Sequence, residues 1–144
     1  MRILIVYYSQ SGNTKKVVDL VKERLKALNH DVTVRNALTA RPEQVLESDL
    51  VLIGTPVHGY ILFGQRPTKE VSEFLEQLPQ DLKEKPAIGF ATYLFFPSRA
   101  LNPIKRAIEA RNGKIIGLIA QRRTKKSILM KEIVGCIQQQ EVKE

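Results

Sequence analysis

The chain of 144 residues has one cysteine, no tryptophan and no apolar run near the roughly 20 residues that a membrane-spanning helix needs. A single cysteine, Cys136, cannot form a disulfide within the chain, so a cytoplasmic location is expected. The first residues carry no small-residue cleavage pattern after their apolar run, which indicates a strand and not a signal peptide. Length and composition, 43% hydrophobic and 26% charged, predict one globular domain over 1–144.

Several motifs of enzymes and nucleotide-binding proteins are also missing. The chain contains neither G-x-x-x-x-G-K-[ST], which binds triphosphates, nor G-x-G-x-x-G, which binds dinucleotides. It shows neither the order of a Ser-His-Asp catalytic triad nor the G-x-S-x-G motif that carries the nucleophile of many hydrolases. Its two histidines, His30 and His58, are too far apart to suggest a metal site. A phosphate-accepting receiver domain is disfavoured, because Tyr7-Tyr8-Ser9 stands where the acceptor Asp should end the first strand.

Short apolar runs alternate with helical repeats along the chain. Buried parallel strands are predicted at 3–7, 50–53 and 87–91. An alternating pattern predicts an edge strand at 31–36, and the last strand is predicted at 114–120. Gly54-Thr55-Pro56 is expected to stop the strand that ends at 53. Helices are predicted at 14–28, 42–47, 68–78, from about 101 to a stop at Gly113, and at 127–138, with a frayed tail after it. This alternation predicts an α/β fold, a three-layer doubly wound parallel sheet with right-handed crossovers.

The stretch that organises the chain is 2–14, R-I-L-I-V-Y-Y-S-Q-S-G-N-T, where a buried strand passes through a turn into a helix. Free backbone N–H groups and the helix dipole favour an anion at such a junction. Side-chain donors surround Gly12 in this turn, namely Ser9, Ser11, Asn13 and Thr14. These mostly neutral donors suit a terminal monophosphate. The alternative is an ordinary strand-to-helix turn, with Asn13 or Thr14 as the N-cap.

Three loops should converge at the carboxyl ends of the strands, where open parallel sheets bind ligands: 9–14, 55–65 and 92–98. None of them contains Asp or Glu, so a hydrolase would lack its general base there. They are rich instead in apolar and aromatic residues, namely Pro56, Val57, Tyr60, Tyr93, Phe95 and Phe96. Together with the phosphate-binding donors of the 9–14 turn, this composition predicts a site for a flat ring system with a phosphate tail. Phe95 and Phe96 could alternatively belong to the core or face a partner.

Over nearly its whole length the chain resembles a short-chain flavodoxin or a flavodoxin-like domain. S-Q-S-G-N-T is similar to the family's phosphate loop. D-L-V-L-I-G-T-P-V-H-G-Y and A-I-G-F-A-T-Y-L-F-F-P resemble the segments that flank the two sides of the isoalloxazine. The resemblance implies a five-stranded parallel sheet in the order 2-1-3-4-5, FMN as cofactor, and electron transfer through the semiquinone and hydroquinone forms of the flavin.

The resemblance also implies which residues bind FMN, and it implies no catalytic residue and no metal ligand. The phosphate would be held by Ser9, Gln10, Ser11, Gly12, Asn13 and Thr14. One side of the ring would be lined by Thr55, Pro56, Val57, His58, Gly59 and Tyr60, and the other by Thr92, Tyr93 and Leu94. Gly59 would let a neighbouring carbonyl turn toward the flavin N5. Tyr60 or His58 would replace the tryptophan that often lies beside the ring.

The charge departs from that of many flavodoxins, which are strongly acidic. The net charge here is +8, and residues 98–144 hold 11 basic and 4 acidic side chains, densest at Arg122, Arg123, Lys125 and Lys126. A redox partner protein with an acidic surface is therefore expected, unless the patch is only a solvated loop. No membrane partner is expected, and nucleic acid is disfavoured because no aromatic residue interleaves the basic run. Without acidic groups near the flavin, a less negative reduction potential is expected.

Other functions fit the same residues. An FMN-dependent oxidoreductase could bind a quinone- or porphyrinogen-like substrate at Phe95-Phe96. A flavoprotein could instead serve one dedicated enzyme, as the small flavoprotein of ribonucleotide reductase does, or a module could retain the fold without flavin. Steady turnover with NAD(P)H and quinone would favour the oxidoreductase. A colourless protein that takes up no FMN would favour the module.

Overall fold

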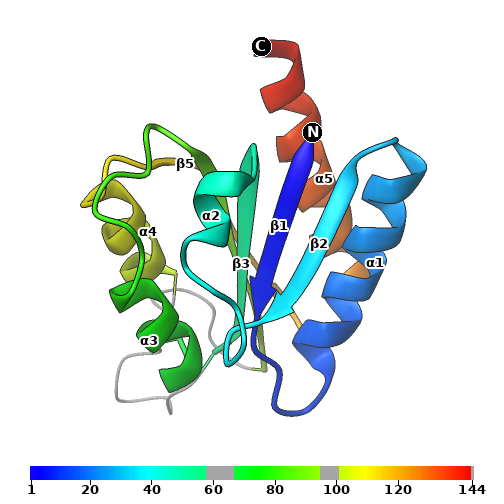
Figure 1. Ribbon diagram of the computed structural model, residues 1–144. Helices are drawn as coiled ribbons and strands as arrows, with labels where there is room; N and C mark the ends of the chain where they lie inside the picture. Colours follow the sequence, from blue (N-terminus) through cyan, green and yellow to red (C-terminus); the bar gives the residue numbers. More distant parts are fainter. Residues whose placement is uncertain (58–66, 95–100, 144) are drawn as a thin grey trace.

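The computed structural model describes residues 1–57, 67–94 and 101–143, and its strands and helices alternate along the chain (Figure 1). The strands are β1 (Arg2–Tyr7), β2 (Asp31–Asn36), β3 (Leu50–Pro56), β4 (Pro86–Tyr93) and β5 (Lys114–Arg122). The helices are α1 (Asn13–Ala27), α2 (Gln44–Glu47), α3 (Lys69–Glu76), α4 (Asn102–Glu109) and α5 (Lys126–Lys143). The predicted alternation of five strands with helices is confirmed.

The five strands form one parallel sheet in the order β2-β1-β3-β4-β5, as the family resemblance implies. Helices α1 and α5 cover one face, and α3 and α4 cover the other, which gives three layers (Figure 1). Alternate residues of each central strand supply the two cores: Ile5 and Leu52 lie in the core with α1 and α5, whereas Val6 and Ile53 lie in the other. The carboxyl ends of the strands meet at the edge where α1 begins, opposite the two termini (Figure 1).

Helices α1 and α3 each bury one stripe of apolar residues at helical spacing. In α1 the stripe includes Val17, Val21 and Leu25, each fully buried. In α3 it includes Val71, Phe74 and Leu75, and Thr68 caps this helix by accepting a hydrogen bond from the backbone N–H of Val71 at 3.4 Å. Each stripe removes apolar surface from water against the sheet, and this burial orients the helix that follows each loop.

The prediction that Gly54-Thr55-Pro56 stops the third strand is wrong, because β3 continues to Pro56 beside β4. Thr55 pairs with Ala91, and Pro56 pairs with Thr92. The pairing of β1 with β3 ends two residues before Pro56, at Tyr7 and Gly54. Proline is tolerated at the last residue of β3 because only one neighbouring strand reaches it. Residues that resemble a loop in the sequence therefore belong to the sheet.

The end of α4 also differs from its prediction. The helix was predicted to stop at Gly113, but α4 ends at Glu109, and Asn112, with φ of 60°, adopts the left-handed conformation. Gly113 has a packing role, since a Cβ atom there would lie 2.5 Å from Cγ2 of Ile108. Asparagine is one of the few residues with a side chain that often adopts positive φ, and the glycine next to it leaves room for the core.

The predicted frayed tail after residue 138 is wrong as well, because α5 is helical to Lys143. Glu141 explains part of the difference: its Oε1 lies 3.1 Å from Nε2 of His30, which is 8% exposed. The other ring nitrogen of His30, Nδ1, lies 3.0 Å from the amino group of Met1. Contacts between residues 111 positions apart leave no periodic signal in the sequence. Among the residues described, no helix is long and apolar enough to cross a membrane.

Candidate functional site

The loop between β1 and α1 is built around the hydroxyl of Ser9. Its Oγ accepts hydrogen bonds from the backbone N–H groups of Gly12, at 3.1 Å, and Lys15, at 3.2 Å. Gly12 is the N-cap of α1 and has φ of 88°, a left-handed conformation that glycine adopts without strain. The N-cap predicted for the ordinary-turn alternative, Asn13 or Thr14, is therefore wrong. This arrangement folds the loop back over the first turn of α1.

Two backbone donors of that first turn remain available. Among the described residues, no acceptor is recorded for the N–H groups of Asn13 and Thr14, and the cap makes no side-chain hydrogen bond. Nearby, Nδ2 of Asn13 donates to Oγ of Ser11 at 2.9 Å, and Ser11 is exposed. The first turn contains no acidic residue. Free N–H groups and the positive end of a helix dipole, without a competing carboxylate, are suited to an anion.

A buried pair of hydroxyls joins this loop to the far side of the predicted site. Oγ1 of Thr14 lies 3.1 Å from Oγ1 of Thr92, at 1% and 0% exposure. The backbone carbonyl of Thr92 also accepts a hydrogen bond from the N–H of Val57 at 3.0 Å. Thr92 therefore connects three segments that are remote in sequence: the start of α1, the end of β3 and the end of β4.

The second predicted segment is described only as far as Val57. Thr55 is fully buried, and its hydroxyl donates to the carbonyl of Pro56 at 2.8 Å and accepts from the N–H of Thr68 at 3.1 Å. Thr55 thus links the end of β3 to the cap of α3. Val57 is half-buried and packs against the core that includes α3 and α4. His58, Gly59 and Tyr60 lie outside the described residues, so their roles stay predictions.

The third predicted segment ends at the surface. Tyr93, the last residue of β4, is half-buried, and Leu94 is 55% exposed. The carbonyl of Tyr93 accepts a hydrogen bond from the N–H of Arg123 at 2.9 Å, so the turn after β5 lies directly beside it. Phe95 and Phe96, proposed from the sequence as a substrate rim, lie outside the described residues.

Basic side chains that the sequence interpretation did not assign to the site lie beside the loop. Lys15 and Lys16 directly follow Thr14, and this position in the sequence could have indicated that they lie beside the site. Burial, followed by the positive charges of Lys16 and Arg123, lowers the pKa of Lys126. The ion pair with Asp19, at 3.1 Å, raises the pKa of Lys15. The starts of α1 and α5 thus combine their positive charges at this edge of the sheet.

The described part of the edge fits a phosphate and offers no cation site. The side chains around the start of α1 are hydroxyls, amides and ammonium groups, which donate hydrogen bonds or interact with negative charge. Over the described residues, no three His, Cys, Asp or Glu side chains form a group that could hold a metal ion. The edge therefore matches the anion chemistry predicted from the sequence.

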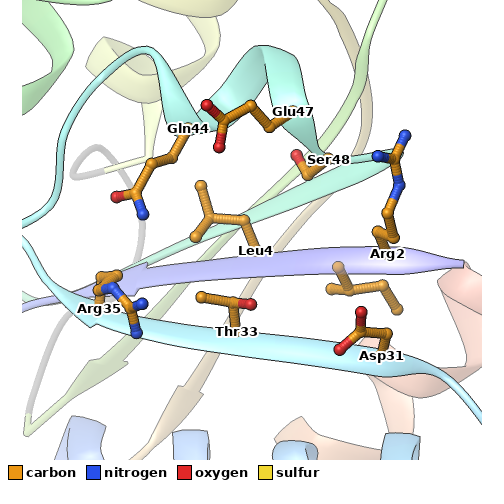
Figure 2. A pocket seen from close by; sticks show the side chains of 9 residues that line it. Arg2, Leu4, Asp31, Thr33, Arg35, Gln44, Glu47 and Ser48 are labelled. Atoms are coloured by element: carbon orange, nitrogen blue, oxygen red, sulfur yellow. The ribbon is translucent and has the colours of Figure 1, made fainter.

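A hollow of about 270 Å³ lies elsewhere, between α2 and the first two strands (Figure 2). Side chains of both charges line it, including Arg2, Arg35, Asp31 and Glu47, with Leu4 and Thr33 between them (Figure 2). None of its nine lining residues is aromatic. This lining offers no flat surface for a ring to stack on, so the carboxyl edge of the sheet remains the candidate site.

Comparisons with known proteins show the family of the chain. Residues 4–131 match the family model described as a flavodoxin domain. A flavodoxin of Clostridium beijerinckii is 25% identical over 89 residues, and the match spans 62% of this chain and 62% of that relative.

Solved structures of flavodoxins share the fold. The two-electron reduced flavodoxin of Megasphaera elsdenii has a TM-score of 0.80 at 24% identity, covering 93% of this chain and 96% of its own. Oxidised flavodoxin 2 of Bacillus cereus has a TM-score of 0.82 at 21% identity, covering 97% and 99%.

Proposed function

This chain belongs to the flavodoxin domain family of FMN electron-transfer proteins, and we propose that the carboxyl edge of its sheet holds FMN. When bound, FMN supplies the electron-transfer chemistry, and the protein holds and orients it. The observation that carries the proposal is the start of α1, where the N–H groups of Asn13 and Thr14 have no recorded acceptor among the described residues. A phosphate accepts hydrogen bonds from such a turn.

The proposal assigns each part of the cofactor to a segment. The phosphate is held by the six residues from Ser9 to Thr14, with Ser9 shaping the loop from inside. One side of the ring is assigned to Thr55, Pro56 and Val57, continuing into His58, Gly59 and Tyr60 outside the described residues. The other side is assigned to Thr92, Tyr93 and Leu94. Thr55 and Thr92 are buried and support the site from within the protein. Half-buried Tyr93 and exposed Leu94 are accessible to a ligand.

The partner assigned to this electron carrier is a redox protein with an acidic surface. Family membership supports a redox partner protein, and the net charge of +8 supports an acidic one. A cytoplasmic location is proposed from the single cysteine, Cys136, which is half-buried. Burial raises the pKa of its thiol, so Cys136 is mainly protonated near neutral pH and poorly reactive.

Replacing Ser9 with Ala is expected to weaken FMN binding by about tenfold. The substitution removes the acceptor of the Gly12 and Lys15 N–H groups, and a net hydrogen bond is worth about 0.5–1.5 kcal/mol. Without it, the loop no longer favours the conformation that directs the Asn13 and Thr14 N–H groups outward. Titration of each variant with FMN, followed by flavin fluorescence, measures the dissociation constant.

Thr33→Val is the matched control. It removes a hydroxyl of β2 that lines the hollow between α2 and the first two strands. Its FMN affinity should equal that of the unmodified protein. Riboflavin, which lacks the phosphate, should bind Ser9→Ala and the unmodified protein equally well. An equal loss of riboflavin affinity in Ser9→Ala would contradict a specific role for this loop in holding the phosphate.

A further inference from the structure

Five basic side chains gather where the turn after β5 meets the start of α1. Arg122 ends β5 opposite Tyr93, and the backbone of Arg123 is hydrogen-bonded to Tyr93 at 2.9 Å. Lys126 begins α5, and its ammonium group donates to the carbonyl of Arg123. Lys126 is near enough to Lys16 of α1 for the second charge to affect its titration. Together with Lys125, these four residues form what we call the basic edge.

Several basic side chains elsewhere on the surface are paired with carboxylates. Lys15, Lys69 and Lys105 each pair with a carboxylate four residues further along the chain, and Arg2 pairs with Asp49. Within the described residues, no ion pair is recorded for any of the five members of the basic edge. Nε of Arg123 is moreover buried without a hydrogen-bond partner in that part of the chain. Like charges held together in this way repel each other until a counter-charge arrives.

Exposed apolar side chains accompany the charges. Leu94, which follows Tyr93, is 55% exposed, and Ile128, in the first turn of α5, is 45% exposed. Ile128 also lines a shallow hollow formed by residues 123–128. Only four large hydrophobic residues of the described chain are this exposed, so two of the four border the basic edge. Apolar contacts beside charged groups are typical of protein–protein interfaces.

We propose that the basic edge, with Leu94 and Ile128, is the docking surface for an electron-transfer protein whose own redox centre lies beneath a carboxylate-rich face. The proposal rests on the function proposed above, because docking here would place the partner beside Tyr93 at the proposed ring site. Carboxylates of the partner would pair with Arg122, Lys125 and Lys126, and its apolar groups would cover Leu94 and Ile128. Charge complementarity would also accelerate the encounter and orient the two proteins.

A nucleic acid suits this surface less well. Proteins that bind single strands interleave basic side chains with aromatic ones that stack on the bases. Residues 121–131 contain no aromatic residue. The exposed apolar residues nearby, Leu94 and Ile128, are aliphatic and would be covered better by a protein surface.

The test measures binding of the FMN-loaded protein to an acidic plant-type [2Fe–2S] ferredoxin by titration calorimetry, at low and at high salt. Lys125→Glu reverses one charge of the basic edge and should weaken binding at low salt by roughly threefold to tenfold. Lys114→Glu is the matched control: it makes the same charge change at the start of β5, at the opposite edge of the sheet, and should leave binding unchanged. High salt should remove the difference between the variants, because it screens exposed charges.

Three other results would overturn the proposal. One is equal weakening by Lys125→Glu and Lys114→Glu, which would indicate a net-charge effect without a defined surface. Another is that basic cytochrome c binds as well as the ferredoxin. The third is that a 20-nucleotide single-stranded DNA, and not the ferredoxin, binds in a manner sensitive to Lys125→Glu. The visible flavin spectrum of each sample separates these outcomes from failure of the proposed function, because a protein that takes up no FMN stays colourless.

Discussion

Replacing Thr92 with Val is expected to lower the free energy of unfolding by about 1–3 kcal/mol, the usual cost of leaving a buried polar group without its partner. The hydroxyl of Thr14, 1% exposed, has Thr92 as its recorded partner at 3.1 Å. Valine keeps the shape of threonine but cannot form a hydrogen bond. Urea denaturation of the apoprotein, monitored by circular dichroism, measures the change.

The double substitution Thr14→Val with Thr92→Val makes this prediction specific. When both partners become apolar and keep their shape, no buried hydroxyl is left unpaired, and the net cost becomes small. The double variant should therefore be more stable than either single variant, with a clear coupling energy in the cycle. Additive losses would contradict the account and would show that the two hydroxyls act independently.

Gly54→Ala is expected to destabilise the protein by about 1–3 kcal/mol or more, the usual cost of overpacking a core. A Cβ atom at this position would lie 2.3 Å from Cζ of Phe90, far inside a normal contact. Phe90 is fully buried and stands opposite Gly54 in the pairing of β3 with β4. The ring therefore occupies the space that any other residue at position 54 would need.

Gly135→Ala serves as the matched control for the glycine substitution. Gly135 lies inside α5, and a Cβ atom there would meet nothing within 4 Å. Alanine in a helix interior should stabilise the protein by up to about 1 kcal/mol. Combining Gly54→Ala with Phe90→Leu should recover part of the loss, because the smaller side chain leaves room. Destabilisation by Gly135→Ala as large as that by Gly54→Ala would refute the steric explanation.

The sheet was predictable from the sequence because its three central strands, β1, β3 and β4, are buried on both faces. Ile3, Ile5 and Leu52 belong to short apolar runs separated by helical repeats, and this pattern indicates a doubly wound sheet. Strand ends were less predictable, because Gly-Thr-Pro favours a turn locally. Pairing with β4 nevertheless keeps Thr55 and Pro56 in the sheet. Tertiary contacts override local preference at such positions.

The candidate site was predictable in part. The turn from Ser9 to Thr14 could be identified because donors cluster directly after a buried strand. Its internal geometry could not, since the Thr14–Thr92 pair joins residues 78 positions apart. The same holds for the approach of Lys16 to Lys126, which depends on how α1 and α5 pack on one face of the sheet. Sequence periodicity defines the faces of the helices but leaves open which of their ends come together.

Titration of the unmodified protein with FMN and with riboflavin, under the same conditions, tests most directly whether the loop after β1 holds a phosphate. The two ligands share the ring system and differ in the phosphate. We expect FMN to bind at micromolar concentration or below and at least about tenfold more tightly than riboflavin, a difference of about 1.4 kcal/mol. Equal affinity for the two ligands, or no binding of FMN at micromolar concentration, would contradict the account.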